Sequence, residues 1–364
     1  MIITRDLVDQ VLGQFFDPYL GKSCSYAELA VAADTQVSDD GRVFLHIELP
    51  YPHVNPAAAF NAPLAAALHA HNARDVHIRW STQVPRIKAQ GEVASIPAIR
   101  NVIAVASGKG GVGKSTTAVN LALALAAEGA SVGMLDADIY GPSLPMMLGI
   151  GSGIRPNTID NAWFVPHRAH GLDVMSIGFL IDAKTPVVWR GPKATGALIQ
   201  LLTQTRWSAL DYLIVDMPPG TGDIQLTLAQ RVPVAGAVIV TTPQDIALLD
   251  AQKGIEMFRK VDINVLGVVE NMAQHICSAC GHVEAIFGSG GGERIAQDYQ
   301  TRLLGQLPLD RRIREQTDSG LPTVVTEPDS SISLAYREIA RHLAAQLALG
   351  EAIADNRILM NPAQ

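Results

Sequence analysis

The sequence predicts an α/β protein in which a mostly parallel sheet is flanked by helices and is preceded by a second, smaller α/β domain. Short apolar runs alternate with helical stretches after residue 101, which is typical of buried parallel strands joined by crossover helices. The first 84 residues show instead the two-residue period of a half-buried strand. A stretch of little periodicity separates the two patterns, so the chain is expected to divide there.

We therefore divide the chain into four parts. Residues 1–84 form the small α/β domain, and residues 85–100 form a linker of mixed charge that contains glycine and proline. Residues 101–350 form the main domain, and residues 351–364 form a C-terminal tail. A chain of 364 residues is long enough for one large and one small domain.

The composition excludes several classes of protein. The net charge of −7 argues against broad nucleic-acid binding, which needs a basic face. The N-terminus lacks a charged start followed by an apolar run, and no apolar stretch approaches the ~20 residues that span a bilayer. Three cysteines do not make a disulfide framework. We expect a cytoplasmic protein with no membrane or nucleic-acid partner.

The small domain is predicted to contain a helix, a strand, a second helix and a second strand, with any strand before residue 43 left open. Apolar residues alternate with other residues between Val43 and Leu49, which indicates the first strand. A short helix is expected over Ala65–His71 and a strand over Val76–Trp80. The apolar face of the first helix is expected to consist of Leu7, Val11 and Phe15.

The main domain is predicted to hold a buried parallel sheet. Its strands are expected at Val102–Ala106, Ser131–Leu135, Tyr212–Val215, Ala237–Val240 and Val265–Val269. Apolar residues between Ala118 and Leu125 recur at helical spacing after the first strand, and Gly129 can end that helix. A closing helix is expected over Ile332–Leu349, with Gly350 placed to stop it.

A glycine-rich segment between the first predicted strand and helix fits the phosphate-loop pattern G-x-x-x-x-G-K-[S/T]. The glycines let the backbone N–H groups face a polyphosphate, and the following helix adds its positive end. Lys114 can reach the β- and γ-phosphates of ATP, and Ser115 can ligate Mg²⁺. The alternative is a glycine-rich turn without a ligand. The predicted nucleotide-binding segment is Gly108, Lys109, Gly110, Gly111, Val112, Gly113, Lys114, Ser115 and Thr116.

Three aspartates follow predicted strands and are candidates for the same site. Asp136 and Asp138 come after the second strand, and Asp216 follows the strand at Tyr212–Val215. The carboxyl edge of a parallel sheet is where ligands bind in this architecture, and a P-loop enzyme places a Walker B carboxylate near Mg²⁺ there. The alternatives are a strand-end cap for Asp216 and a turn cap for Asp136.

Lys109 is unusual, because an ordinary phosphate loop needs no lysine directly after its first glycine. Here the chain resembles the deviant Walker A ATPases, such as MinD, ParA and the nitrogenase iron protein. In that group the extra lysine reaches across a dimer to the nucleotide of the partner. The resemblance therefore implies a homodimer; the alternative is a solvated loop lysine.

Cys277 and Cys280 form a C-x-x-C, a spacing at which two thiolates can bind one soft metal centre. His275 and His282 could complete a zinc site within the chain, the pair could cycle as a disulfide, or two chains could share an iron–sulfur cluster. Two cysteines without a ligand are the remaining alternative, and the dimer implied by the extra lysine favours the shared cluster. The third cysteine, Cys24, is expected to be a packed small residue.

From about residue 102 to 345 the chain resembles the Mrp/ApbC family of iron–sulfur cluster carrier ATPases. The resemblance is carried by the phosphate loop, by D-A-D-I-Y-G-P-S at 136–143, by D-M-P-P-G-T-G-D at 216–223, and by E-N-M at 270–272 ahead of the C-x-x-C. The first domain resembles the small iron–sulfur assembly domain often fused to such ATPases. That domain commonly carries a cysteine after its central strand, where this sequence has Pro52-His53.

The resemblance implies a role for each matched residue. Lys109 and Lys114 would act with Asp138 in catalysis, Asp138 by positioning or activating the attacking water. Asp216 would contact the Mg²⁺ shell, and Asn271 would bind the adenine edge. Residues 220–223 would form a switch that senses the γ-phosphate.

The function implied is an ATP-dependent iron–sulfur cluster carrier. A homodimer would hold a cluster, expected to be 4Fe–4S, between its subunits, with cluster scaffold proteins and apo iron–sulfur proteins as partners. One rival is a MinD/ParA-like positioning ATPase, which would want a basic apolar tail that residues 350–364 do not offer. The other is an ATP-driven reductase like the nitrogenase iron protein.

Overall fold

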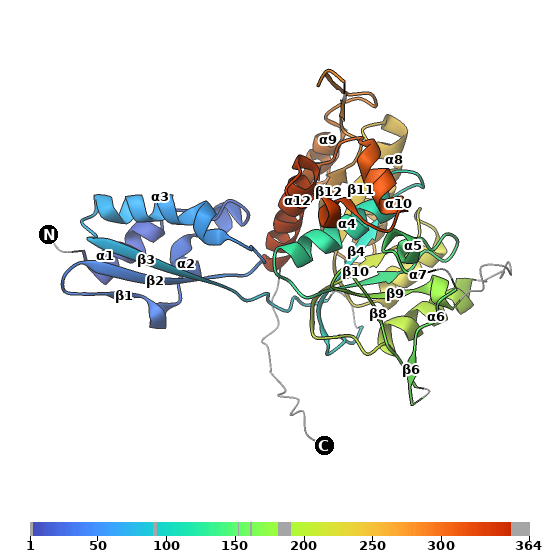
Figure 1. Ribbon diagram of the computed structural model, residues 1–364, viewed down its shortest axis with the longest axis horizontal. Coiled ribbons are helices and arrows are strands. Elements are labelled where there is room, and N and C mark those ends of the chain that lie inside the picture. Colours follow the sequence, from blue (N-terminus) through green and yellow to red (C-terminus); the bar gives the residue numbers. More distant parts are fainter. Residues whose placement is uncertain are drawn as a thin grey trace. The chain divides into compact units, whose positions relative to one another are not determined.

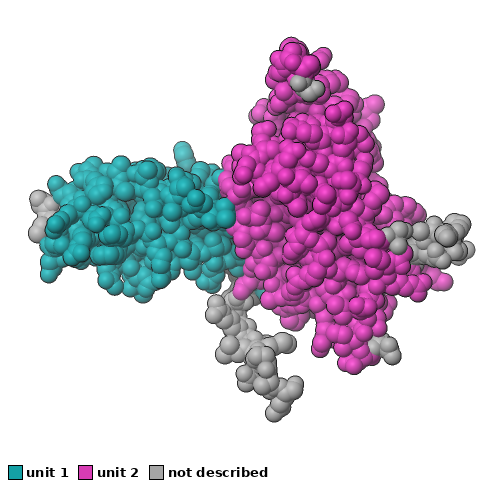
Figure 2. All heavy atoms as spheres, in the orientation of Figure 1, with its two compact units in different colours: residues 1–88, 345–364 teal, residues 89–344 magenta. Residues whose placement is uncertain are grey.

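The computed structural model describes residues 3–89, 93–151, 153–160, 162–180, 191–277 and 279–350. By contacts the chain separates into two compact units, Met1–Lys88 with Ala345–Gln364 and Ala89–Ala344 (Figure 2). The tail predicted over 351–364 lies outside the described residues. In the part of the chain that is described, no helix is long and apolar enough to cross a bilayer.

The first unit contains a three-stranded sheet in the order β1-β2-β3 (Figure 1). Its strands are β1 (Gln36–Val37), β2 (Arg42–Leu49) and β3 (Asp75–Thr82). Its helices are α1 (Arg5–Leu12), α2 (Tyr26–Leu29) and α3 (Pro56–Ala70). The alternation expected from the sequence is confirmed, since Val43, Leu45, Ile47 and Leu49 of β2 are all buried. The parallel pairing of β2 with β3 requires the crossover that α3 provides.

Two predictions for this unit were wrong in their bounds. α1 ends at Leu12, so Phe15 lies beyond it. α3 begins at Pro56, nine residues before the predicted start, because Pro56 occupies the first turn, where its missing N–H costs nothing. The Asn55 side chain caps this helix by accepting from the Ala58 N–H.

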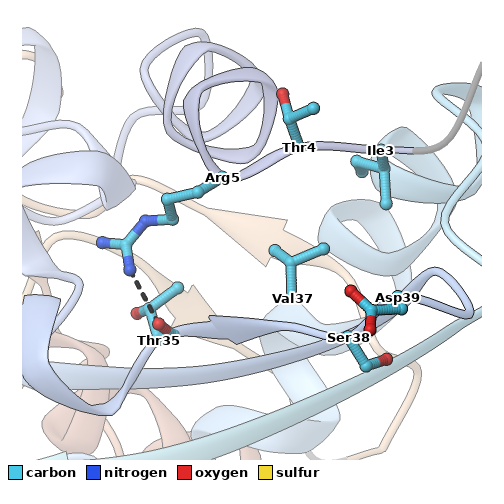
Figure 3. A pocket seen from close by; sticks show the side chains of 7 residues that line it. All are labelled: Ile3, Thr4, Arg5, Thr35, Val37, Ser38 and Asp39. Atoms are coloured by element: carbon cyan, nitrogen blue, oxygen red, sulfur yellow. Dashed lines mark hydrogen bonds between the residues drawn. The ribbon is translucent and has the colours of Figure 1, made fainter.

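A shallow hollow of about 350 Å³ lies beside the start of α1 and is drawn in Figure 3. The Arg5 guanidinium donates to the Thr35 carbonyl at 2.7 Å and to the Asp9 carboxylate at 3.0 Å. These contacts tie α1 to the segment before β1, so they give Arg5 a structural role. The lining residues are Ile3, Thr4, Arg5, Thr35, Val37, Ser38 and Asp39.

The second unit is built on an eight-stranded sheet in its described residues, in the order β15-β12-β11-β4-β10-β5-β9-β8 (Figure 1). Only β8 runs antiparallel to its neighbour. The strands are β4 (Ile99–Ala106), β5 (Val132–Asp136), β8 (His167–Ala169), β9 (Leu172–Ser176), β10 (Leu210–Asp216), β11 (Val234–Thr241), β12 (Val265–Glu270) and β15 (Leu303–Gln306). Two short hairpins pair β6 (Thr158–Ile159) with β7 (Trp163–Phe164) and β13 (His275–Ile276) with β14 (Val283–Glu284).

Helices cover both faces of this sheet (Figure 1). They are α4 (Lys114–Ala127), α5 (Leu144–Met147), α6 (Gly191–Thr203), α7 (Asp223–Arg231), α8 (Asp245–Arg259), α9 (Gly291–Asp298), α10 (Arg311–Asp318), α11 (Thr323–Thr326) and α12 (Ser331–Ala348). Gly129 follows α4 with a φ of 104°, a conformation that favours glycine and ends the helix as predicted.

All five predicted strands of the sheet are present and parallel, which confirms the expected fold class. The prediction missed β8, β9 and β15, which are short and contain polar or glycine residues. The strand order places β10 between β4 and β5, and Asp216 pairs in register with Asp136 on one side and Val105 on the other. Three strands therefore deliver their carboxyl ends to one point of the sheet.

Candidate functional site: a phosphate loop and a cysteine hairpin

The phosphate loop runs from the end of β4 to the start of α4. Gly113 precedes α4 and takes a φ of 78°, which orients the loop amides toward the space in front of the helix. The Ser107 hydroxyl donates to the Lys109 carbonyl at 2.8 Å, and this bond helps to curl the loop. A Cβ built on Gly110 or Gly111 meets no heavy atom within 4 Å, so the loop borders open space that a polyphosphate fits.

Two glycines of the loop lie close against neighbouring elements. A Cβ on Gly108 would lie 2.0 Å from the backbone oxygen of Asp250 in α8, so only glycine lets the loop rest against that helix. A Cβ on Gly113 would lie 2.3 Å from the amide nitrogen of Asn271. The loop is thus held between α8 and the end of β12.

Lys114 and Asp216 form an ion pair below the loop. The Lys114 Nζ donates to Asp216 Oδ1 at 2.5 Å, and both side chains are buried. Among the described residues Asp216 Oδ2 has no hydrogen-bond partner. Burial raises the pKa of Asp216, partly offset by the Lys114 charge. A buried acceptor beside a lysine and the Ser115 hydroxyl, 3.2 Å from the Lys114 nitrogen, fits a phosphate with its Mg²⁺.

Asp136 lies beside Asp216 at the end of β5 and is fully buried. Its carboxylate accepts from the Ser176 hydroxyl at 3.0 Å and from the Leu144 and Asp138 N–H groups at 3.1 Å. Burial, followed by the nearby Asp216 charge, raises the pKa of Asp136 to about 7. This carboxyl therefore organises the site from below.

Asp138 lies on the segment that follows β5 and is partly exposed. Its Oδ1 accepts from the Tyr140 and Gly141 N–H groups, each at 3.2 Å, which shapes the turn. The turn presents this carboxylate on the same edge of the sheet as the phosphate loop. The structure therefore brings Asp136, Asp138 and Asp216 together, as the sequence predicts.

The remaining predicted residues surround the loop. Lys109 is half-buried. The Thr116 carbonyl accepts from Asn120 at 3.0 Å inside α4. Asn271 donates its amide to the Val112 carbonyl at 2.9 Å. Gly220, at the start of the predicted switch, donates its N–H to the Ser107 carbonyl at 2.9 Å, so that segment contacts the loop directly.

The cysteine pair lies in the turn between β13 and β14, a few residues after β12 ends. The Cys277 N–H donates to the His282 carbonyl, and the Gly281 N–H donates to the Cys277 carbonyl, each at 2.9 Å. Cys277 is half-buried and Cys280 is exposed, and both are free thiols. Ser278 lies outside the described residues. The turn therefore presents both thiols on the surface of the unit.

The turn also favours the thiolate that binds metals. Hydrogen bonds from the Ala279 and Cys280 backbone, and from the Cys280 side chain, lower the pKa of Cys277. His275 instead lies against the Leu309 carbonyl at 3.1 Å. Among the described residues no group of three or more His, Cys, Asp or Glu side chains could hold a metal ion, so the zinc site of Cys277, Cys280, His275 and His282 is not formed in this conformation.

Cys24 matches its expected structural role. It is half-buried in the first unit, and its Sγ lies 3.7 Å from the Ser25 carbonyl. Burial and, after it, the charges of Glu28 and Asp17 raise its pKa to about 11. Such a thiol is a poor nucleophile and a poor metal ligand.

Three residues of the site were missed by the sequence analysis. Ser176 binds Asp136 from β9, and Asp250 supports Gly108 from α8. Gln225 of α7 donates to the Pro219 carbonyl, directly before the predicted switch, at 2.5 Å. None of them belongs to a motif. The D-M-P-P-G-T-G-D run marks the segment that Gln225 holds, but the other two contacts arise only from the strand order and the packing of α8.

The chain has a glycine-rich loop between a buried strand and a helix, and the lysine of this loop forms an ion pair with an aspartate at the end of a neighbouring strand. These features define a P-loop nucleotide-binding protein. The chain matches, over residues 98–344, the ParA family described as NUBPL iron-transfer P-loop NTPase, and it belongs to this family.

Known relatives support the assignment over nearly the whole chain. An iron-sulfur cluster carrier protein from Pseudomonas fragi is 66% identical over 253 residues, covering 70% of this chain and 88% of that protein. A protein of the same name from Haemophilus influenzae is 50% identical over 346 residues, covering 94% and 92%. A solved nucleotide-binding protein from Archaeoglobus fulgidus, in complex with ADP, is 38% identical with a TM-score of 0.56, covering 64% of this chain and 90% of that one.

Proposed function

We propose that this chain is an ATP-dependent iron–sulfur cluster carrier that binds a cluster between two copies of itself and passes it to apoproteins. One observation carries the proposal: an exposed C-x-x-C turn, with a Cys277 thiol of lowered pKa, follows the strand whose end touches the phosphate loop. The family and the names of its relatives support the same function.

The phosphate loop would hold ATP with Mg²⁺ and support hydrolysis. Loop amides from Gly108 to Thr116 would bind the phosphates, and Lys114 would exchange Asp216 for the β- and γ-phosphates. The Ser115 hydroxyl and the released Asp216 carboxylate would hold Mg²⁺, which neutralises phosphate charge when bound. Asp138 would orient the attacking water.

Asn271 is placed to contact the base of the nucleotide. Its amide nitrogen carries two N–H donors, and one of them serves the Val112 carbonyl. The second would donate to the adenine edge.

Lys109 would act across a homodimer. Its position directly after Gly108 puts it at the open side of the loop, where Gly110 and Gly111 border free space. From there its ammonium group would reach the phosphates bound by the partner and stabilise their developing negative charge. A dimer formed through this edge of the sheet is the arrangement that a lysine in trans requires.

The cargo is proposed to be a 4Fe–4S cluster. Such a cluster takes four thiolates, and the turn of one chain provides Cys277 and Cys280. Two chains would complete the ligand set. The cluster would come from a scaffold protein and leave to an apo iron–sulfur protein, with nucleotide state setting how tightly the thiolates hold it.

We also propose that the two domains of the chain have separate roles. Residues 1–84 would form an assembly-like domain, joined by a linker at 85–100 to an ATPase domain at 101–350. At the place where assembly domains commonly carry a cysteine, this chain has His53, which is buried against Tyr19 and Phe60. The first domain would therefore not bind iron at this position.

Anaerobic reconstitution with iron and sulfide tests the function. A brown protein with broad absorption near about 400 nm, the charge-transfer band expected for thiolate-bound iron, is the expected result. A colourless protein with intact ATP hydrolysis would contradict the carrier proposal and favour a positioning ATPase.

A further inference from the structure

The end of β12 connects the phosphate loop to the cysteine turn over a very short distance in the chain. Asn271, the first residue after β12, donates its side-chain amide to the Val112 carbonyl at 2.9 Å. A Cβ on Gly113 would lie only 2.3 Å from that amide nitrogen, so the loop packs directly against the Asn271 side chain. Cys277 lies six residues further along the chain.

Met272 is the residue that turns the chain between these two sites. Its φ is +57°, in the left-handed region that side chains other than Gly, Asn and Asp rarely adopt. The Asn271 side chain fixes this conformation by accepting from the Met272 N–H at 3.0 Å. Conformations of this kind persist only where the surroundings hold them, and they cluster at switch regions.

The segment on both sides of Met272 is braced by the sheet. The Asn271 N–H donates to the Thr241 carbonyl at 2.8 Å, and the Ala273 N–H donates to the Leu307 carbonyl at 2.9 Å. The Leu309 N–H then donates to the Gln274 carbonyl at 2.8 Å, just before β13, which leads into the cysteine turn. The chain between Asn271 and the cysteine turn is therefore held by backbone hydrogen bonds at Asn271, Ala273 and Gln274.

We infer that Asn271 and Met272 form a mechanical joint through which the nucleotide in the phosphate loop controls the position of Cys277. Phosphate binding turns the loop amides toward the ligand and reorients the Val112 carbonyl that Asn271 holds. The left-handed Met272 passes this change to the braced segment and on to the turn. Met272 is thus a positioning residue, and the inference rests on the proposed function, which it extends by giving the coupling route.

The test measures Cys277 alkylation in the full-length, reduced and cluster-free protein. Iodoacetamide labelling, resolved by peptide mass spectrometry, is timed without nucleotide and with Mg²⁺ and ATPγS. In the native protein the Cys277 labelling rate should change several-fold with nucleotide. Met272→Gly, which adopts positive φ without restraint, should bind ATPγS as tightly but lose most of that change. Met272→Leu, which keeps the bulk and the restraint, should behave as native.

Asp262→Gly is the matched control, because Asp262 has the same φ of 57° in an exposed turn ahead of β12. It should keep the full nucleotide response, which separates the joint from a general gain in flexibility. If Met272→Gly is too unstable to bind nucleotide, Met272→Asn replaces it and must show a weakened response.

Two results would overturn the inference: a native protein whose Cys277 labelling ignores bound ATPγS, or a glycine variant with the full response. Both are independent of iron. A protein that shows the joint but never takes up a cluster would instead refute the proposed function.

Discussion

The phosphate loop and the cysteine turn belong to one unit, yet they are built in opposite ways. Lys114, Asp136 and Asp216 are buried, and hydrogen bonds from β5, β9 and β10 hold them. The cysteine turn lies on the surface, with Cys280 exposed and the neighbouring Ile276 and Val283 about half exposed. In the described residues the turn around Cys277 is shaped by local hydrogen bonds, mainly from the backbone.

The two sites differ in how many of their binding groups one chain supplies. A nucleotide-binding site needs several groups at fixed geometry, and one sheet edge of this chain supplies all of them except the lysine proposed to act across the dimer. A four-thiolate cluster needs ligands that this chain offers only in part, and exposed apolar residues beside the thiols suit contact with a second surface. Substitutions at the phosphate loop and at the cysteine turn should therefore have different effects.

The largest expected effect is at the phosphate loop. Lys114→Ala should lower the ATP hydrolysis rate on the order of 10²–10³-fold, because a preorganised charge on the transferred phosphate is lost. Asp216 then remains buried without its partner, so the melting temperature should also fall. Lys253→Ala, which removes an exposed lysine in α8, is the control. A folded Lys114→Ala protein that hydrolyses ATP at the native rate would contradict the assignment of this loop as the nucleotide-binding site.

Substitutions in the cysteine turn should remove bound iron while leaving ATP hydrolysis at least partly intact. Cys277→Ser and Cys280→Ser should each remove most bound iron after reconstitution, since every thiolate of a four-ligand set is needed. Hydrolysis should survive at least in part, because the loop is built from another segment. Iron and protein assays on the dimer fraction should give about four irons per two native chains. Cys24→Ser should keep the iron, and its loss there would move the site to the first unit.

Mixing two inactive chains tests whether the nucleotide site is complete within one chain. Lys109→Ala should bind ATP but hydrolyse it slowly. In a heterodimer with Lys114→Ala, one loop keeps Lys114 and receives Lys109 from the other chain, so part of the activity should return. Heterodimers that form without any recovery of hydrolysis would argue against action across the interface.

Substitutions of two loop glycines should differ sharply in their effect on the stability of the protein. Gly108→Ala places a Cβ 2.0 Å from the Asp250 backbone oxygen and should lower the melting temperature by many degrees or prevent folding. Gly110→Ala meets no atom within 4 Å and should melt close to the native protein. Equal melting temperatures would show that α8 does not support the loop as described.

The smallest expected effect is on pH dependence. The pKa of Asp136 is raised to about 7 in the folded protein, against about 4 when unfolded. Between these values the folded state binds the extra proton, so its stability falls as pH rises toward 7 and levels off above it. Thermal melts of nucleotide-free protein should show this fall, and Asp136→Asn should reduce it. An identical pH profile for the variant would mean that Asp136 stays ionised.

The sequence alone identified the candidate residues of both sites because each of them lies in a local motif. The segment from Gly108 to Ser115, the strand-end Asp216 and the cysteine pair all follow from local patterns of residue type and spacing. The strands around them were predicted since buried parallel strands are apolar on both faces. The start of α3 was predicted nine residues too late because Pro63, which lies inside the helix, is normally a helix breaker.

What only the tertiary structure decided is how these motifs meet. The order of strands, with β10 between β4 and β5, puts Asp136 beside Asp216 and raises its pKa. The support of Gly108 by Asp250 and the contact of Asn271 with Val112 join residues 142 and 159 positions apart. Such contacts leave no local pattern, because periodicity records which face of an element is buried and not which element covers it.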